Sequence, residues 1–156
     1  MEQLNCLNQV AEFHRTFHHP IEPNPVIPAP GRCELRVSLI AEELKELEEA
    51  IRNKDIVEVA DALCDIQYVL SGAILEFGLG EKFKALFDEV QRSNMSKACK
   101  TLEEAEETVK YYKEERGTDC YYEKDGDVYL VYRTGDNKTL KNIYYSPADL
   151  KQVLSA

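Results

Sequence analysis

The sequence has 156 residues, a length that suits one domain with at most a small appendage. Charged residues make up 31% of the chain and hydrophobic residues 44%, as in globular rather than disordered proteins. The net charge of −10 argues against binding to a nucleic acid polymer or to an anionic membrane surface, although a cation could bring in a small anionic ligand.

The five cysteines are odd in number and widely spaced, with no C-x-x-C pair. This pattern argues against a disulfide framework and predicts reduced thiols in a cytoplasmic protein. The opening residues MEQLNCLNQVAEF lack the basic and apolar regions of a signal peptide. The most apolar stretch, residues 66–79, is too short to span a bilayer, so no membrane segment is expected.

In chain order, apolar residues at helical spacing first predict an amphipathic helix over residues 3–17. The segment HPIEPNPVIPAPG (19–31) contains five prolines and predicts an extended connector without helix. Three more helices are predicted over about 34–53, 56–77 and 81–98, and Gly78 and Gly80 are expected to end the second of these three.

The last third of the chain changes character. Thr101-x-x-Glu104 is typical of a capping box and predicts a fifth helix over about 102–116, which Gly117 is expected to end. The alternating segment 121–132 contains an Asp-Gly pair and predicts a β-hairpin, with residues 139–145 as a candidate third strand. Ser146 followed by Pro147 predicts the cap and first position of a short final helix.

Acidic residues on two of the predicted helices fall on restricted faces. At 3.6 residues per turn, Glu58, Asp61, Asp65 and Glu76 share a stripe only about 60° wide on an otherwise apolar helix. Glu43 and Glu46 are i, i+3 neighbours on the preceding helix, as Glu58 and Asp61 are on theirs. Because the connector is short, the helices should be antiparallel neighbours, and Glu43, Glu46, Glu58 and Asp61 are expected to converge.

Such a cluster requires compensation, because carboxylates beside apolar surface lose hydration and repel one another. No basic residue lies between Lys54 and Lys82, and the facing line of the other helix is expected to offer none. A solvated face is the simpler interpretation for Glu42, Glu48 and Glu49. For the converging acids we expect a divalent cation. Because the ligands are oxygens without a Glu-x-x-His pair, magnesium or manganese and chemistry on phosphate are favoured.

The acidic motifs also carry a resemblance to a known family. Glu42-Glu43-x-x-Glu46 followed by Glu58-x-x-Asp61 resembles the signature of the all-α nucleoside triphosphate pyrophosphatases, which include the MazG-like proteins and the phosphoribosyl-ATP pyrophosphohydrolases. The segment VAEFHRTFHHPIEPNPVIP, the motif FDEVQRSNMSKA and the closing KNIYYSPADL resemble one MazG-like subgroup. The overlap covers residues 8–98 and resumes near 138, while the helix and tyrosine-rich hairpin between them depart from the pattern.

This resemblance implies a mainly α fold, with an antiparallel four-helix bundle and a small C-terminal β-hairpin or meander. Residues 1–100 would form the helical catalytic bundle, and residues 101–156 a helix, a hairpin and a short final helix packed on it. The implied reaction is metal-dependent hydrolysis of a nucleoside triphosphate between the α and β phosphates, which yields a monophosphate and pyrophosphate. Phosphoribosyl-ATP hydrolysis and non-catalytic nucleotide binding remain as alternatives.

The resemblance also implies roles for individual residues. The metal ligands, for Mg²⁺ or Mn²⁺, would be Glu43, Glu46, Glu58 and Asp61, and either Glu42 or Glu43 would activate the attacking water. Substrate-binding residues would be Asp65, Arg92, Asn94, Lys97, Lys141 and Tyr144. The apolar girth of the helix over 56–77 further predicts a homodimer or homotetramer, because one chain offers too few helices to cover it.

Overall fold

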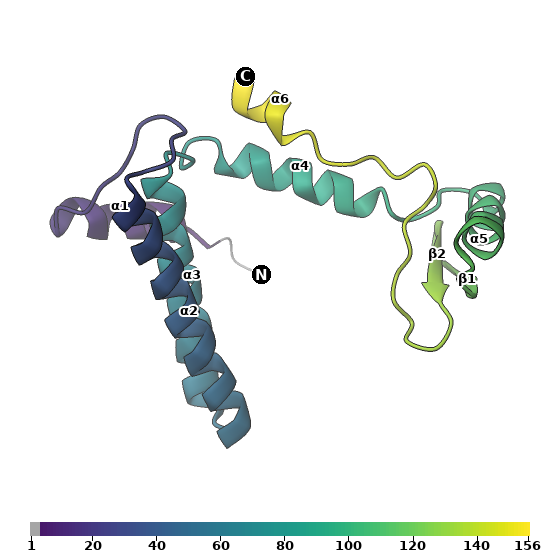
Figure 1. Cartoon of the computed structure of the whole chain (residues 1–156), viewed down its shortest axis with the longest axis horizontal. Coiled ribbons are helices and arrows are strands. Elements are labelled where there is room, and N and C mark those ends of the chain that lie inside the picture. The colour runs from purple at the N-terminus through teal and green to yellow at the C-terminus, as the bar shows by residue number, and fades with distance from the viewer. Residues whose placement is uncertain (1–3) are drawn as a thin grey trace. The chain divides into compact units, whose positions relative to one another are not determined.

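The computed structural model of the protein describes residues 4–156. In this range the chain is mainly helical with a small antiparallel hairpin, as predicted (Figure 1). The elements are α1 (Cys6–Thr16), α2 (Pro30–Asn53), α3 (Ile56–Glu76), α4 (Phe83–Met95), α5 (Leu102–Arg116), β1 (Cys120–Asp125), β2 (Val128–Arg133) and α6 (Leu150–Ser155). They divide into two compact units, Met1–Phe83 and Lys84–Ala156, called here the first and the second unit.

Helices α2 and α3 form an antiparallel pair in the first unit (Figure 1). Helix α2 starts four residues earlier than predicted, because Pro30 occupies its first turn, where no N–H partner is needed. Lys54 ends α2 in a left-handed conformation, and the Asp55 carboxylate then caps α3 by accepting hydrogen bonds from the N–H groups of Val57 and Glu58. The tight connection brings the acidic faces of both helices together.

Helix α1 packs against α3 in the same unit. The predicted helix over 3–17 is confirmed over Cys6–Thr16, and residue 3 lies outside the described residues. Val10, Ala11 and Leu75 form the buried core here. The proline-rich connector lies against the end of α3, where its N–H groups at residues 22 and 26 donate to the carbonyls of residues 75 and 77. Three helices therefore pack together in the first unit, and the predicted four-helix bundle is not confirmed.

Large apolar side chains of α2 and α3 remain exposed on the first unit. Ile56 and Val57, at the start of α3, are 76% and 70% exposed. Val37, Leu44 and Ile51 of α2 are also exposed. These side chains belong to the apolar faces that the sequence predicts to be covered, so this chain's described residues leave much of that surface in contact with solvent.

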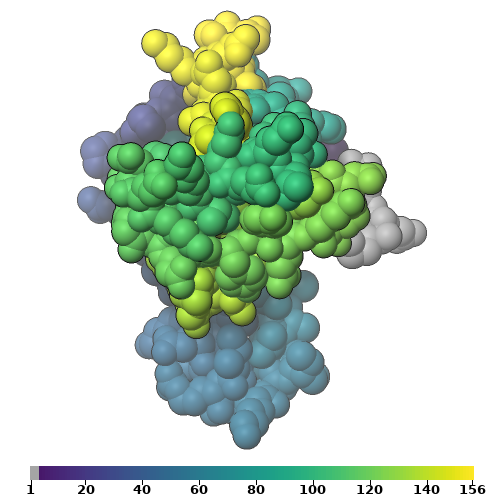
Figure 2. Space-filling model, turned by 90° about the vertical axis from the view of Figure 1, so that its right-hand side faces the viewer, coloured from purple at the N-terminus to yellow at the C-terminus, as the bar shows by residue number. Residues whose placement is uncertain are grey.

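The second unit packs α5 against the hairpin, and Figure 2 shows their side chains in contact on one face. Thr101 caps α5 by accepting a hydrogen bond from the Glu104 N–H, and Gly117 ends it in the left-handed conformation, as predicted. Strands β1 and β2 pair in the register Cys120–Arg133 to Asp125–Val128. The buried core beneath them consists of Cys99, Ala105, Cys120, Val131 and Leu140.

Two predictions for the closing segment are wrong. Residues 139–145 form no third strand: only one bridge, from Tyr132 to Thr139, continues the sheet. The buried Asn142 side chain instead ties this segment to the Ala98 carbonyl and the Glu104 carboxylate. The final helix begins at Leu150 and is capped by Asp149, whose carboxylate accepts from the Gln152 N–H, rather than by Ser146, whose hydroxyl accepts from Arg92. Along the described chain, no helix has the length and apolar character needed to cross a bilayer.

Candidate functional site

The acidic faces of α2 and α3 enclose a groove of about 380 Å³. Glu46 of α2 and Glu58 and Asp61 of α3 line it, and Ala50 and Ala62 form its floor. Small side chains at these two positions let the helices approach closely, so the carboxylates on either side face a shared space. Three of the four predicted metal ligands therefore meet in one groove.

Glu43, the fourth predicted ligand, lies one turn before Glu46 on α2. Its Oε2 atom is buried and has no hydrogen-bond partner. Burial raises the pKa of Glu43 above its usual value, and the carboxylates of Glu46, Asp65, Glu42 and Asp61, in decreasing order of effect, raise it further. The fourth carboxylate thus points toward its acidic neighbours and keeps an unused acceptor among them.

The chemistry of this donor set suits a hard divalent cation. All the groups are carboxylates, the ligands that magnesium and manganese prefer, and the orphaned Oε2 of Glu43 is the kind of buried acceptor that a cation satisfies. Among residues 4–156, however, no three acidic, histidine or cysteine side chains lie close enough together to form a complete metal-binding group. The residues fit the predicted ion in chemical type, and their roles as ligands stay a prediction.

Two further acids flank Glu43 in different ways. Asp65 is half-buried one turn beyond Asp61, and its charge raises the pKa of Glu43. Glu42 precedes Glu43 on α2 and is exposed. Burial therefore distinguishes the two candidates for water activation, because only Glu43 combines burial with an unpaired oxygen.

The predicted substrate-binding residues of α4 and of the turn that follows it lie in the second unit and have local partners there. Arg92 donates to the carboxylate of Glu89, to the Ser146 hydroxyl at 3.0 Å and to the Pro147 carbonyl at 3.0 Å. Its hydrogen bonds lower the pKa of Glu89 to about 2. Lys97 donates to the amide oxygen of Asn94 at 2.9 Å. In this structure Arg92 fastens the closing segment to α4.

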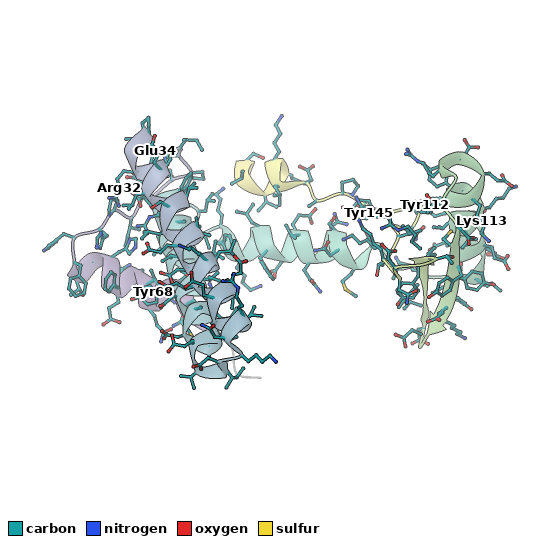
Figure 3. The ribbon with its side chains drawn as sticks, turned by 60° about the horizontal axis from the view of Figure 1, so that its bottom comes forward. Arg32, Glu34, Tyr68, Tyr112, Lys113 and Tyr145 are labelled. Carbon is teal, nitrogen blue, oxygen red and sulfur yellow. The ribbon has the colours of Figure 1, made fainter. Side chains whose placement is uncertain are left out.

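Lys141 and Tyr144, from the closing segment, also have partners within the second unit. The Lys141 ammonium lies 4.5 Å from the centre of the Tyr145 ring, a cation–π contact. The Tyr144 hydroxyl donates to Glu107 at 2.7 Å. Lys141 lines a cavity of about 360 Å³ with Tyr112 and Tyr145, which Figure 3 shows near one another. Their contact with substrate stays a prediction.

The expectation that no basic residue faces the acidic stripe is wrong at its C-terminal end. Arg32 and Arg36 of α2 both donate to the carboxylate of Glu76, which is 1% exposed. Burial favours the neutral form of Glu76, but the hydrogen bonds and charges of the two guanidinium groups outweigh it and lower the pKa. Arg32 and Arg36 stand one turn apart on α2, a spacing that marks them as a pair, but they precede the acidic motif, and no local pattern links them to Glu76 of α3.

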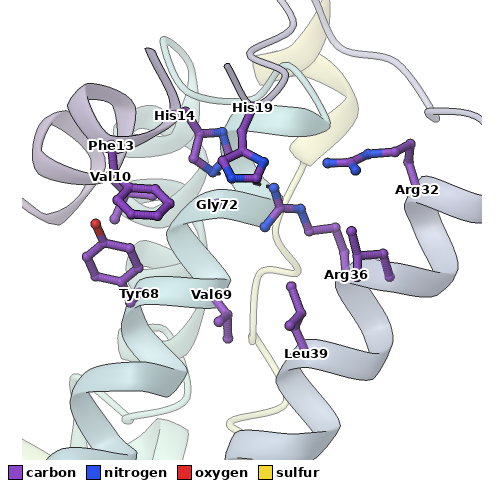
Figure 4. Close-up of a pocket in the computed structure, with 11 residues that line it drawn as sticks. Val10, Phe13, His14, His19, Arg32, Arg36, Leu39, Tyr68, Val69 and Gly72 are labelled. Carbon is purple, nitrogen blue, oxygen red and sulfur yellow. Dashed lines mark hydrogen bonds between the residues drawn. The ribbon is translucent and has the colours of Figure 1, made fainter. Parts of the chain in front are cut away.

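A cavity of about 240 Å³ lies beside this ion cluster (Figure 4). The Phe13 ring stacks on His19 with an angle of 9° between the planes and meets Tyr68 edge-on. Figure 4 shows Leu39 and Arg36 on the α2 side of the space. The aromatic wall comes from α1, the connector and α3, three separate segments whose meeting could not be read from local sequence patterns.

Comparisons with known proteins place the chain in a family. Residues 10–94, more than half of its length, match the family model of phosphoribosyl-ATP pyrophosphohydrolase. The chain is also similar to the uncharacterized protein L479 of Acanthamoeba polyphaga mimivirus, with 24% identity over an alignment 245 positions long that covers 98% of this chain and 97% of the viral protein. The matched segment contains all of α2 and α3 and therefore the whole acidic groove. The chain belongs to the phosphoribosyl-ATP pyrophosphohydrolase family, within the MazG-like all-α nucleoside triphosphate pyrophosphatases.

Proposed function

We propose that the protein hydrolyses a nucleoside triphosphate between the α and β phosphates, with Mg²⁺ or Mn²⁺ held by Glu43, Glu46, Glu58 and Asp61. One observation carries the proposal: the buried, unpaired Oε2 of Glu43 lies among other carboxylates beside the acidic groove. A divalent cation compensates both the mutual repulsion and the missing hydrogen bond. Family membership supports pyrophosphohydrolase chemistry at the same residues.

The side chains divide the work according to burial. Glu46, Glu58 and Asp61 line the groove and would hold the cation there. When bound, the cation offsets charge on the phosphates and makes a water more acidic. Glu43 would orient that water through the carboxylate oxygen that does not bind the cation and would accept its proton, while the exposed Glu42 is the second candidate. Asp65, one turn beyond Asp61 on α3, would contact the substrate or reach a second cation.

The remaining site residues belong to the second unit. We propose that Asn94, Lys97, Lys141 and Tyr144 contribute substrate contacts after their local hydrogen bonds rearrange, with Arg92 holding the closing segment in place. The exposed apolar side chains of α2 and α3 support a homodimer or homotetramer in which further helices complete a four-helix bundle. All five cysteines are free thiols, which supports a reducing, cytoplasmic setting.

The decisive experiment measures pyrophosphate release from a panel of nucleoside triphosphates and phosphoribosyl-ATP, with Mg²⁺, with Mn²⁺ and with chelator. We expect release that requires the cation. Glu43→Gln should lower kcat/KM by about 10²- to 10⁴-fold, because both a ligand and a proton acceptor are lost. Glu42→Gln should have a much smaller effect if Glu43 activates the water.

Glu48→Gln provides the matched control. Glu48 is an exposed carboxylate on the same helix and pairs with Arg52 at the surface, so the variant should retain the wild-type rate. Nucleotide binding without any pyrophosphate release would reject the enzymatic proposal and favour a nucleotide-binding regulator. An equal loss of kcat/KM in Glu43→Gln and Glu48→Gln would reject the assignment of the acidic groove as the catalytic site.

A further inference from the structure

The aromatic cavity and the acidic groove both lie along the pair of helices α2 and α3. Moving back along α2, Glu43, Leu39 and Arg36 succeed one another at intervals of about one turn. Along α3, in the opposite direction, Asp65, Val69 and Gly72 lie next to these three residues of α2. The charge of Asp65 raises the pKa of Glu43. Leu39 and Val69 both line the cavity, and Arg36 lies against Gly72. Seven residues separate Glu43 from Arg36, roughly 10 Å along the helix. A ribose bridges such a span between phosphates and base.

The walls of the cavity suit a flat aromatic group. One part of the lining is apolar: Val10 lies beside the Phe13 ring, and Leu39 of α2 lies across the space from Phe13 and Tyr68 (Figure 4). Phe13 is held in place by stacking on His19 at 5.7 Å and by the edge contact with Tyr68 at 5.6 Å. Planar bases stack on such surfaces whatever their identity, so this part of the cavity explains binding but not selectivity.

Selectivity would come from the polar end of the cavity, where hydrogen-bond donors predominate. Arg36 donates a hydrogen bond from Nε to the Glu76 carboxylate and another from Nη2 to the Nε2 atom of His14. His14 in turn contacts the Pro20 carbonyl through Nδ1 at 2.8 Å, which fixes the ring as an acceptor toward Arg36. The Nη1 group of Arg36 has no hydrogen-bond partner among the described residues. A side chain at Gly72 would come within 2.7 Å of it, so glycine leaves room for this donor.

Side-chain acceptors are few in the described lining: besides His14, only the His19 ring and the Tyr68 hydroxyl can accept a hydrogen bond. No aspartate, glutamate, asparagine or glutamine is among the described residues that line the cavity. The acceptor atom of His14 is occupied by Arg36, and the Glu76 carboxylate is held by two guanidinium groups. A carbonyl oxygen of a base can pair with Arg36, whereas an exocyclic amino group would face a cation and lose its hydrogen bonds to water.

We infer that this cavity binds the base of the nucleotide and selects bases that carry an oxo group where cytosine and adenine carry an amino group, through the free Nη1 group of Arg36. This inference rests on the proposed function for the position of the phosphates. The substrate class is thus nucleotides of 4-oxopyrimidines and 6-oxopurines. Phe13 and Tyr68 provide the stacking surface, and Gly72 and Glu76 position Arg36.

The test uses nucleoside monophosphates, because their binding does not depend on hydrolysis. Calorimetric titrations of the full-length protein with Mg²⁺ would compare deoxyuridine with deoxycytidine monophosphate, and deoxyinosine with deoxyadenosine monophosphate. Each pair shares its sugar and phosphate, so the difference in affinity reports the base. We expect the oxo member to bind at least about tenfold more tightly in both pairs. Equal affinities, preference for the amino member or absence of binding would overturn the inference.

Variants then locate the effect. Val69→Phe fills the cavity and should abolish the preference, whereas Ile27→Phe adds the same ring at a connector position that is 77% exposed and should retain it. Arg36→Lys keeps the charge beside Glu76 but removes the guanidinium fork, so affinity for the oxo bases should fall toward that for the amino bases. Circular dichroism would verify folding. Should Val69→Phe misfold, Tyr68→Ala offers a second test: Tyr68 is partly exposed, and its removal should weaken all four ligands.

The outcomes separate this inference from the proposed function. A base preference without pyrophosphate release from any triphosphate would leave the cavity assignment standing and reject the enzyme. Pyrophosphate release at equal rates from oxo and amino nucleotides, with no preference in binding, would leave the enzyme standing and reject the cavity assignment. A folded Val69→Phe variant with unchanged preference would also reject it.

Discussion

Replacing Glu76 by glutamine tests how the buried ion cluster stabilises the first unit. Arg36 is 7% exposed and Glu76 1% exposed, so the change leaves a guanidinium charge in the interior without its counter-ion. At an effective dielectric constant near 20, opposite charges about 4 Å apart attract by about 4 kcal/mol. Removing one partner of a buried pair costs a similar 3–5 kcal/mol.

The ion pair of Glu76 with Arg32 contributes less to the expected loss of unfolding free energy. The Arg32 side chain is 35% exposed, so water replaces much of the lost interaction. The Glu76→Gln variant should therefore lose roughly 3–5 kcal/mol of unfolding free energy, mostly through Arg36. Urea titration followed by circular dichroism at neutral pH measures this loss. Hydrogen exchange resolves whether the affected amides lie in α1, α2 and α3.

A double variant separates charge from packing. In Glu76→Gln with Arg36→Met the buried charge is gone, so much of the lost stability should return. Glu48→Gln, which breaks an exposed pair with Arg52, should cost less than about 1 kcal/mol. A loss below about 1 kcal/mol in Glu76→Gln, or a double variant less stable than either single one, would refute the view that Glu76 compensates a buried charge.

Three further predictions concern stability. Burial lowers the pKa of His14, so as pH falls below about 6.5 the imidazole is protonated in the unfolded chain before it is protonated in the folded protein. The unfolding free energy should therefore decline below this pH, and urea titrations at several pH values should show a shallower decline in His14→Gln. Gly78 has φ +68°, and an added Cβ would lie 1.9 Å from the Asn24 carbonyl oxygen, so Gly78→Ala should lower the unfolding free energy by more than about 2 kcal/mol in thermal unfolding. Gly117 has φ +58° but open space around it, so Gly117→Ala should cost only about 1 kcal/mol. Equal costs in the two variants would contradict the clash. Thr101→Ala removes the cap of α5 and should cost about 1 kcal/mol, seen as faster hydrogen exchange in its first turn; unchanged exchange would contradict the role of the cap.

Local patterns determined much of the architecture. Apolar spacing located the helices, the Asp-Gly pair located the hairpin turn, and Gly78 and Gly117 marked two helix ends correctly. The same patterns placed Glu46, Glu58 and Asp61 on facing helices, because the i, i+3 relation and a short connector are properties of neighbouring residues. These features depend on interactions within a few turns of chain, which the sequence contains in full.

Only the tertiary structure determined which residues far apart in the sequence contact one another. Glu76 resembled the other acids of its helix, yet it pairs with Arg32 and Arg36, 44 and 40 residues earlier in the chain. Asn142 prevents a third strand by bonding to residues near α5, although its own segment alternates as a strand would. The aromatic cavity likewise exists only where α1, the connector and α3 meet. Contacts of this kind depend on which helix faces pack together, and that choice is made by burial over the whole fold rather than by local spacing.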